Sequence, residues 1–211
     1  MIPALILAAA LHLANGHGPC VAPATQSDRI TCGDAELRAL AKASLIVGAD
    51  IARTRHQPLW VVAEDGWPAK VEACASRDCI EDAYSVHLGI LSESEPLHLP
   101  GAVWRSAPTQ APRGWALLAT QALGEGWYLY WLDVGFSQGT RADPQPDRTG
   151  HAIGVVHMDR GKGVTGDDAA GLRFETTRRG DWRVIQVGEC ACGHLIRLDG
   201  LYAQRPRKAR P

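Results

Sequence analysis

The chain has 211 residues, enough for one domain of ordinary size or two small ones, and its 45% hydrophobic and 21% charged content is typical of folded soluble proteins. Wholesale disorder is therefore excluded. The formal charge of -1 gives no global field that would attract nucleic acid or an anionic membrane, so we expect no nucleic-acid partner.

The N-terminus has the pattern of an export signal. Residues 2–13 are almost entirely apolar, and the small residues Ala14 and Gly16 precede a predicted cleavage before His17. We therefore predict a signal peptide over 1–16, with a simple buried helix as the alternative. The apolar run is too short to cross a bilayer, and no later stretch approaches the ~20 residues needed, so we expect no transmembrane segment and a periplasmic or secreted protein.

The cysteine count is even, which suits disulfide formation in an exported chain. The six residues are Cys20, Cys32, Cys74, Cys79, Cys190 and Cys192. Sequential pairing closes the shortest loops, so we favour Cys20–Cys32 and Cys74–Cys79. The third pair would need a turn, because residues two apart in an extended strand have Cα atoms ~6.6 Å apart, near the upper limit for a disulfide.

The spacing of apolar residues predicts a first helix over 34–55. Leu37, Leu40 and Ile51 belong to a stripe that repeats every three and four residues, and Asp34 can accept the free backbone N–H groups at the helix start.

Two more helical segments are predicted before residue 95. The segment 59–75 is a candidate that Gly66 and Pro68 should break or kink, and the apolar spacing predicts a third helix over 80–91. A disulfide between the third and fourth cysteines would staple these two helices as an antiparallel pair.

The second half of the chain has the period of β-strands. We expect a linker over 96–114 with a candidate short strand at 102–105, an antiparallel β domain over 115–204 and a basic disordered tail over 205–211. The expected strands span 115–121, 127–136, 151–159, 172–177, 182–187, 194–198 and 201–203. Turns are expected at 124–126, 161–163, 179–181 and 199–200.

These patterns predict an α+β protein. A disulfide-stapled three-helix module over 17–95 is followed by a small antiparallel meander, either a barrel or a sandwich, because short strands adjacent in sequence usually pair. Charge divides at the same boundary. Residues 17–95 hold 7 Lys and Arg against 12 Asp and Glu, a net -5, while residues 96–211 hold 15 against 11, a net +4. Four of those 15 lie in the tail, which leaves the β body neutral.

The helical half resembles the lysozyme inhibitor LprI-like family. The resemblance covers roughly residues 20–93, and its most specific part is the spacing Trp67-x6-Cys74-x4-Cys79-x4-Tyr84. It implies an exported four-cysteine helical module, with lysozyme or another cell-wall-associated protein as partner. The implied module core comprises Leu37, Leu40, Trp67, Tyr84 and Leu88.

An acidic module could be steered toward a basic lysozyme and bind it as an inhibitor. The candidate acidic binding surface comprises Asp28, Glu64, Asp65, Glu72, Glu81 and Asp82. The alternative is a non-catalytic envelope module whose β half recognises peptidoglycan fragments or a periplasmic protein. No catalytic motif is present in the sequence, so we expect a protein that is not an enzyme and uses no cofactor.

One group of residues could bind a metal. Cys190, Cys192 and His194 alternate along one predicted strand, and His151 or His157 could supply a fourth ligand. We favour a disulfide or turn over a metal site, because oxidation in an exported protein removes the thiolates.

Overall fold

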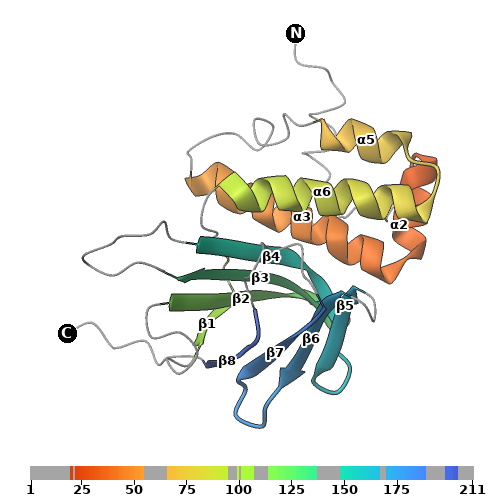
Figure 1. Cartoon of the computed structure of the whole chain (residues 1–211). Coiled ribbons are helices and arrows are strands. Elements are labelled where there is room, and N and C mark those ends of the chain that lie inside the picture. The colour runs from red at the N-terminus through yellow and green to blue at the C-terminus, as the bar shows by residue number, and fades with distance from the viewer. Residues whose placement is uncertain are drawn as a thin grey trace. The chain divides into compact units, whose positions relative to one another are not determined.

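In a computed structural model, the chain divides into two compact units, Met1–Leu97 and His98–Pro211 (Figure 1). The structure describes residues 20, 22–54, 66–94, 99, 101–106, 114–136, 148–166, 170–188 and 198–203. The predicted α+β class is confirmed, because stapled helices are followed by an antiparallel β unit. The domain boundary predicted from the sequence lies between residues 95 and 96.

Four helices are described in the first unit. They are α2 (Gln26–Gly33), α3 (Ala35–Thr54), α5 (Trp67–Ala73) and α6 (Arg77–Ser94). The predicted first and third helices are present as α3 and α6. Helix α2 is not predicted from the sequence, because its residues are mostly polar and show no apolar stripe. Its signal was a capping box, in which the Thr25 hydroxyl accepts from the Asp28 N–H at 3.0 Å and the Asp28 carboxylate accepts from the Thr25 N–H at 3.0 Å.

Gly66 and Pro68 start a helix within the segment 59–75. Gly66 precedes α5 with a φ of 70°, in the left-handed region that favours glycine, and Pro68 lies in the first turn, where a missing N–H breaks no helical hydrogen bond. Residues 59–65 lie outside the described part of the chain.

Both predicted disulfides of the helical unit are present. Cys20 pairs with Cys32 across a Cα–Cα distance of 5.2 Å, and Cys74 pairs with Cys79 across 5.6 Å. The second bond spans the turn between α5 and α6, which run antiparallel (Figure 1). Cys190 and Cys192 lie outside the described residues.

The predicted module core is mostly buried. Leu37, Leu40, Tyr84 and Leu88 are each at most 6% exposed. Trp67 is half-buried, and its ring lies 5.5 Å from the ring of Tyr84. The stapled α5 therefore packs an aromatic side chain against α6.

The β unit is one antiparallel sheet of eight described strands. They are β1 (Ala102–Ser106), β2 (Gly114–Gly124), β3 (Trp127–Phe136), β4 (Arg148–His157), β5 (Lys162–Gly166), β6 (Gly171–Thr176), β7 (Trp182–Val187) and β8 (Gly200–Ala203). The spatial order is β4-β3-β2-β1-β8-β7-β6-β5, an up-and-down meander in which β1 also pairs with β8.

The sheet curls around a single aromatic core. Tyr130 on β3 and Phe174 on β6 are far apart in the strand order, yet their ring centroids lie 4.8 Å apart. Trp182 on β7 contacts Trp104 on β1 and Tyr128 on β3. The inner faces of distant strands therefore meet as in a small barrel whose interior is filled by side chains.

Two predicted turns are only partly right. Gly161 lies in a turn, with a φ of 79°, but Lys162 and Gly163, expected in the same turn, begin β5, a short glycine-rich strand that was not predicted. Gly200, expected in a hairpin turn with Asp199, opens β8 and pairs with Val184. Asp199 instead accepts a hydrogen bond from the Gln186 N–H at 2.7 Å.

The turns at 124–126 and 179–181 are confirmed, with Gly126 at φ 77° and Gly180 at φ 82°. The predicted strand 194–198 and the tail 205–211 lie largely or wholly outside the described residues.

Gly163 is needed where β5 crosses β4. A Cβ at this position would lie 2.6 Å from Val156 Cγ2 and 2.7 Å from the His157 carbonyl oxygen. We predict that Gly163→Ala lowers the free energy of unfolding by about 1–3 kcal/mol through overpacking. Denaturant unfolding followed by tryptophan fluorescence measures the change.

The matched control is Gly89→Ala on α6, where nothing beyond the helix's own backbone lies within 4 Å of the added Cβ. This substitution should leave stability unchanged or raise it by up to about 1 kcal/mol, because alanine is the better helix former. Equal changes in stability for the two substitutions would show that the close approach of Val156 and His157 to residue 163 does not limit the side chain there.

The disulfide Cys74–Cys79 should stabilise the helical unit by restricting the unfolded chain. Replacing Cys74 and Cys79 by serine should lower the free energy of unfolding by about 2 kcal/mol. The same change at Cys20 and Cys32 should lower it by about 3 kcal/mol, because this disulfide closes a longer loop, with a sequence separation of 12 against 5. Urea unfolding followed by far-ultraviolet circular dichroism tests both values. Loss of less than about 0.5 kcal/mol in either variant would argue against this role.

Candidate functional site

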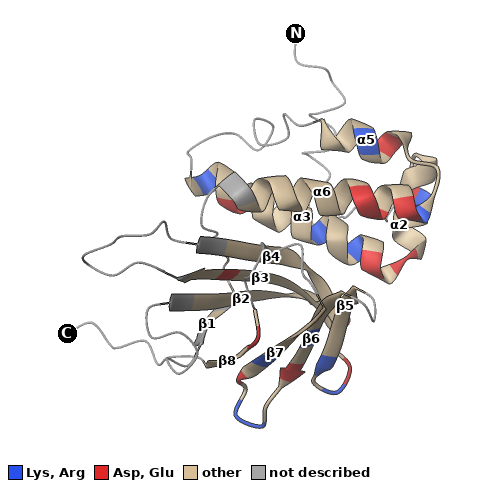
Figure 2. Cartoon of the chain, in the orientation of Figure 1, with Lys and Arg blue, Asp and Glu red and all other residues tan. Residues whose placement is uncertain are grey.

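The residues of the predicted acidic surface have different surroundings in the structure. Asp28 serves the capping box of α2, and Glu81 pairs with Arg77. Glu72 on α5 and Asp82 on α6 are exposed. Glu64 and Asp65 lie outside the described residues. Figure 2 shows that acidic residues gather where α3 and α6 begin.

Arg77 is the centre of this acidic end of the helical unit. Its Nε donates to Asp34 Oδ2 at 3.0 Å, its Nη2 donates to Glu36 Oε2 at 2.6 Å, and its Nη1 donates to Glu81 Oε2. One guanidinium thus ties the first turn of α6 to the first turn of α3.

Asp34 also caps α3. Its Oδ1 accepts hydrogen bonds from the N–H groups of Glu36 at 2.9 Å and Leu37 at 3.0 Å, as the sequence analysis predicted for the helix start. The sequence did not reveal its second partner, because Arg77 is 43 residues away along the chain.

The cluster shifts the pKa values of its members in different directions. Burial alone would raise the pKa of Asp34, but the hydrogen bonds from Leu37 and Arg77 outweigh it and lower the pKa. Burial and the neighbouring Glu81 charge raise the pKa of Glu36. The hydrogen bond to Asp34 contributes most to raising the pKa of Arg77. The guanidinium therefore stays charged and pairs with Asp34 in its ionised form.

An exposed stripe runs along α6 from this acidic end. It consists of Asp78, Asp82, Val86 and Ile90, which follow each other at intervals of four residues, and we call it the α6 stripe. The side chain of Asp78 is 96% exposed, and the apolar residues Val86 and Ile90 are 48% and 46% exposed. The stripe presents charge at one end and apolar surface at the other.

Of this stripe, only Asp82 belongs to the acidic binding surface predicted from the sequence. The apolar stripe that predicts this helix, which includes Ile80, Tyr84 and Leu88, leaves Val86 and Ile90 on another side of the helix, in agreement with their exposure. Their exposure depends on which side of α6 packs against α3 and α5.

His151 and His157 are described, but the other candidate metal ligands are not. His151 pairs in register with Asp133 across β4 and β3, and burial raises the pKa of Asp133 to about 6 although the His151 charge acts to lower it. Cys190, Cys192 and His194 lie outside the described residues. The described part of the chain contains no group of three His, Cys, Asp or Glu that could hold a metal ion.

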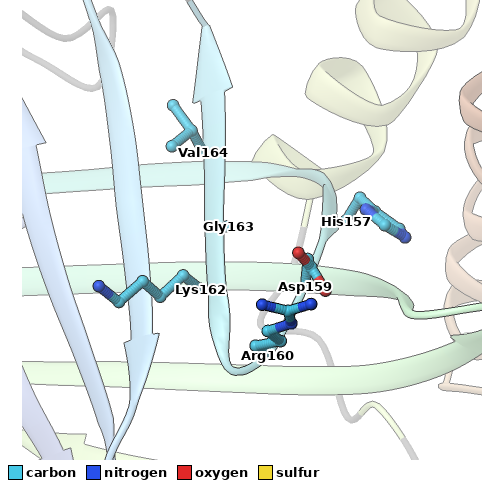
Figure 3. A pocket seen from close by; sticks show the side chains of 6 residues that line it. All are labelled: His157, Asp159, Arg160, Lys162, Gly163 and Val164. Carbon is cyan, nitrogen blue, oxygen red and sulfur yellow. The ribbon is translucent and has the colours of Figure 1, made fainter.

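A shallow pocket lies at the turn between β4 and β5. It is lined by His157, Asp159, Arg160, Lys162, Gly163 and Val164 (Figure 3). His157 also contacts the ring of Trp127, with 5.2 Å between centroids. Arg160 has a φ of 48° and Gly161 a φ of 79°, so the tight turn holds a non-glycine residue in the left-handed region.

No family model, no curated protein and no solved structure matches the chain. Among the described helices, none is long and apolar enough to pass through a membrane. The two disulfides fit a chain that folds in an oxidising compartment.

The double role of Asp34 predicts a pH-dependent stability difference. Asp34→Ala removes the cap and the partner of Arg77 and should cost about 1–2 kcal/mol at pH 7. Asp34→Asn keeps the cap and should cost less. Because the folded-state pKa lies below the unfolded value of 3.8, the charge contribution is present above pH 3.8 and is lost as pH falls through the folded-state pKa.

Urea unfolding of the wild type and both variants at pH 7 and in strong acid measures this difference. The wild type and Asp34→Asn should converge in acid, while Asp34→Ala should remain less stable. A constant gap between the wild type and Asp34→Asn at every pH would refute the ion-pair role.

Proposed function

We propose that the mature chain is an exported binding protein that inhibits lysozyme through its helical unit and catalyses no reaction. The α6 stripe carries this proposal, because it combines exposed carboxylates with exposed apolar side chains on one helix. The proposal also draws on the LprI-like spacing of Trp67, Cys74, Cys79 and Tyr84.

Binding would begin with electrostatic attraction. The exposed carboxylates of Asp78 and Asp82 attract a basic protein, and such attraction raises the association rate more than the final affinity. The neighbouring carboxylates of Asp34, Glu36 and Glu81 add to this field, although Arg77 neutralises one of their charges. High salt should therefore slow the association.

The apolar part of the stripe would supply affinity. Val86 and Ile90 lie one turn apart and can be buried together by a partner, as in other complexes where a helix lies in a groove. The staple at Cys74–Cys79 fixes the start of α6, so little conformational entropy is lost on binding. A rigid helix in the substrate cleft would inhibit lysozyme by excluding the glycan.

The test is a cell-wall clearing assay with c-type and g-type muramidases and the purified mature protein. The wild type should slow clearing in a dose-dependent manner. The double variant Asp82→Lys with Ile90→Ser should raise the half-inhibitory concentration by roughly 10-fold or more, since it reverses a charge and removes an apolar contact worth together over about 1.4 kcal/mol.

Glu72→Lys is the matched control. Glu72 is equally acidic and exposed but lies on α5, outside the stripe, so inhibition should change by less than about threefold. Unchanged clearing at a large molar excess of the wild type would end the inhibitor proposal. Retention on insoluble peptidoglycan without any loss of muramidase activity would favour an envelope binding module instead.

A further inference from the structure

The outer side of strands β5–β8 carries a distinct set of side chains. They alternate along their strands with the residues of the barrel core and therefore face away from it. We call them the basic face, which consists of Lys162, Val164, Arg173, Glu175, Arg183, Ile185 and Leu201.

Strand pairing arranges the basic face in two rows. The first row contains Lys162, Glu175, Arg183 and Leu201. The second row contains Val164, Arg173 and Ile185. Side chains directly opposite each other on paired strands lie about 5 Å apart, so cations and apolar groups are interleaved on one surface.

Positive charge predominates on this face. It has three cations against the single carboxylate of Glu175, of which Oε2 lies 3.9 Å from Arg183 Nη1. Both side chains are partly exposed, so this ion pair is weak. Figure 2 shows the basic residues on β5, on β7 and in the turn between β6 and β7.

The adjoining turns extend the positive region. The Thr176 N–H donates to the Gly161 carbonyl at 2.7 Å, which holds the β4–β5 turn beside the β6–β7 turn. These turns expose Arg160, Arg178 and Arg179. With the two turn carboxylates Asp159 and Asp181 counted, the face and its turns hold six cations and three carboxylates, a net charge of +3.

Apolar side chains project among these cations. Val164 is 61% exposed, Leu201 38% and Ile185 36%. Val164 also lines the shallow pocket at the β4–β5 turn (Figure 3). Cations and isolated apolar groups on one side of a rigid sheet can contact lipid phosphates and the upper acyl region together.

We propose that the basic face binds the surface of a bilayer that contains anionic lipids. A protein partner would need a contiguous apolar centre that excludes water, whereas the apolar residues here are separated by cations. A lipid surface is fluid and supplies both phosphate and hydrocarbon at any spacing. This site lies in the β unit and is independent of lysozyme inhibition by the helical unit.

The test uses the full mature chain with its disulfides intact. Binding is measured by sedimentation with phosphatidylcholine vesicles and with vesicles of equal parts phosphatidylcholine and phosphatidylglycerol. The protein should bind the anionic vesicles and be released by salt. Arg173→Gln with Arg183→Gln should weaken binding roughly 30-fold, from the loss of two basic residues at the surface.

Arg29→Gln with Lys70→Gln is the matched control, since it makes the same change in net charge on exposed positions of the helical unit. It should leave vesicle binding within about threefold of the wild type. Val164→Thr with Ile185→Thr preserves β propensity and should weaken binding several-fold by removing apolar contacts. Far-ultraviolet circular dichroism confirms that each variant is folded.

Three results would overturn the proposal. The first is no binding to the anionic vesicles, or equal binding to neutral ones. The second is an equal loss in the control variant, which would mean that net charge alone governs binding. The third is tight binding to soluble dextran sulfate together with unchanged vesicle binding by the threonine variant, which would indicate a site for soluble polyanions.

Discussion

Covalent cross-linking is the constraint on which the helical unit depends. Helices α2 and α5 have eight and seven residues, and helices this short are marginal in water without external support. Each is held at its end by a cystine: Cys32 lies in the last turn of α2, and Cys74 caps α5. The cross-links lower the entropy of the unfolded chain, so a small core around Leu37 and Leu88 is sufficient. The long helix α6 is thereby fixed with one side open to solvent.

Electrostatic interactions at the start of α6 have both a structural and an external effect. Arg77 forms ion pairs with Asp34, Glu36 and Glu81. These pairs join the starts of α3 and α6, which are distant in sequence. The carboxylates outnumber the cation, so the same end of the unit keeps a negative field. Exposed ion pairs contribute little to stability individually, and the value of this cluster lies in the orientation of α6. The exposed Asp82 and Ile90 owe their fixed positions to it.

The β unit carries a mainly basic surface, whereas the exposed end of the helical unit is acidic. Residues 96–204 are neutral in sum, yet strand register gathers Lys162, Arg173 and Arg183 on one side of the curled sheet. The interior is filled with aromatic rings such as Phe174 and Trp182, which leaves the outer surface and the turns for binding. The two proposals are compatible, because a basic face that binds anionic lipid would hold an acidic inhibitory helix near a membrane surface.

The sequence by itself determined the elements that local chemistry specifies. Short loops between cysteines favoured their pairing, the three-and-four spacing around Leu37 specified α3, and glycines such as Gly126 and Gly180 marked the turns. It missed α2, which is polar, and β5, where Gly163 weakens the strand pattern. Only the tertiary structure decided the rest, because the partner of Asp34 and the rows of the basic face depend on contacts between segments that are distant in sequence. Periodicity reports which residues share a face of an element, but the packing of neighbouring elements decides which face remains open to solvent.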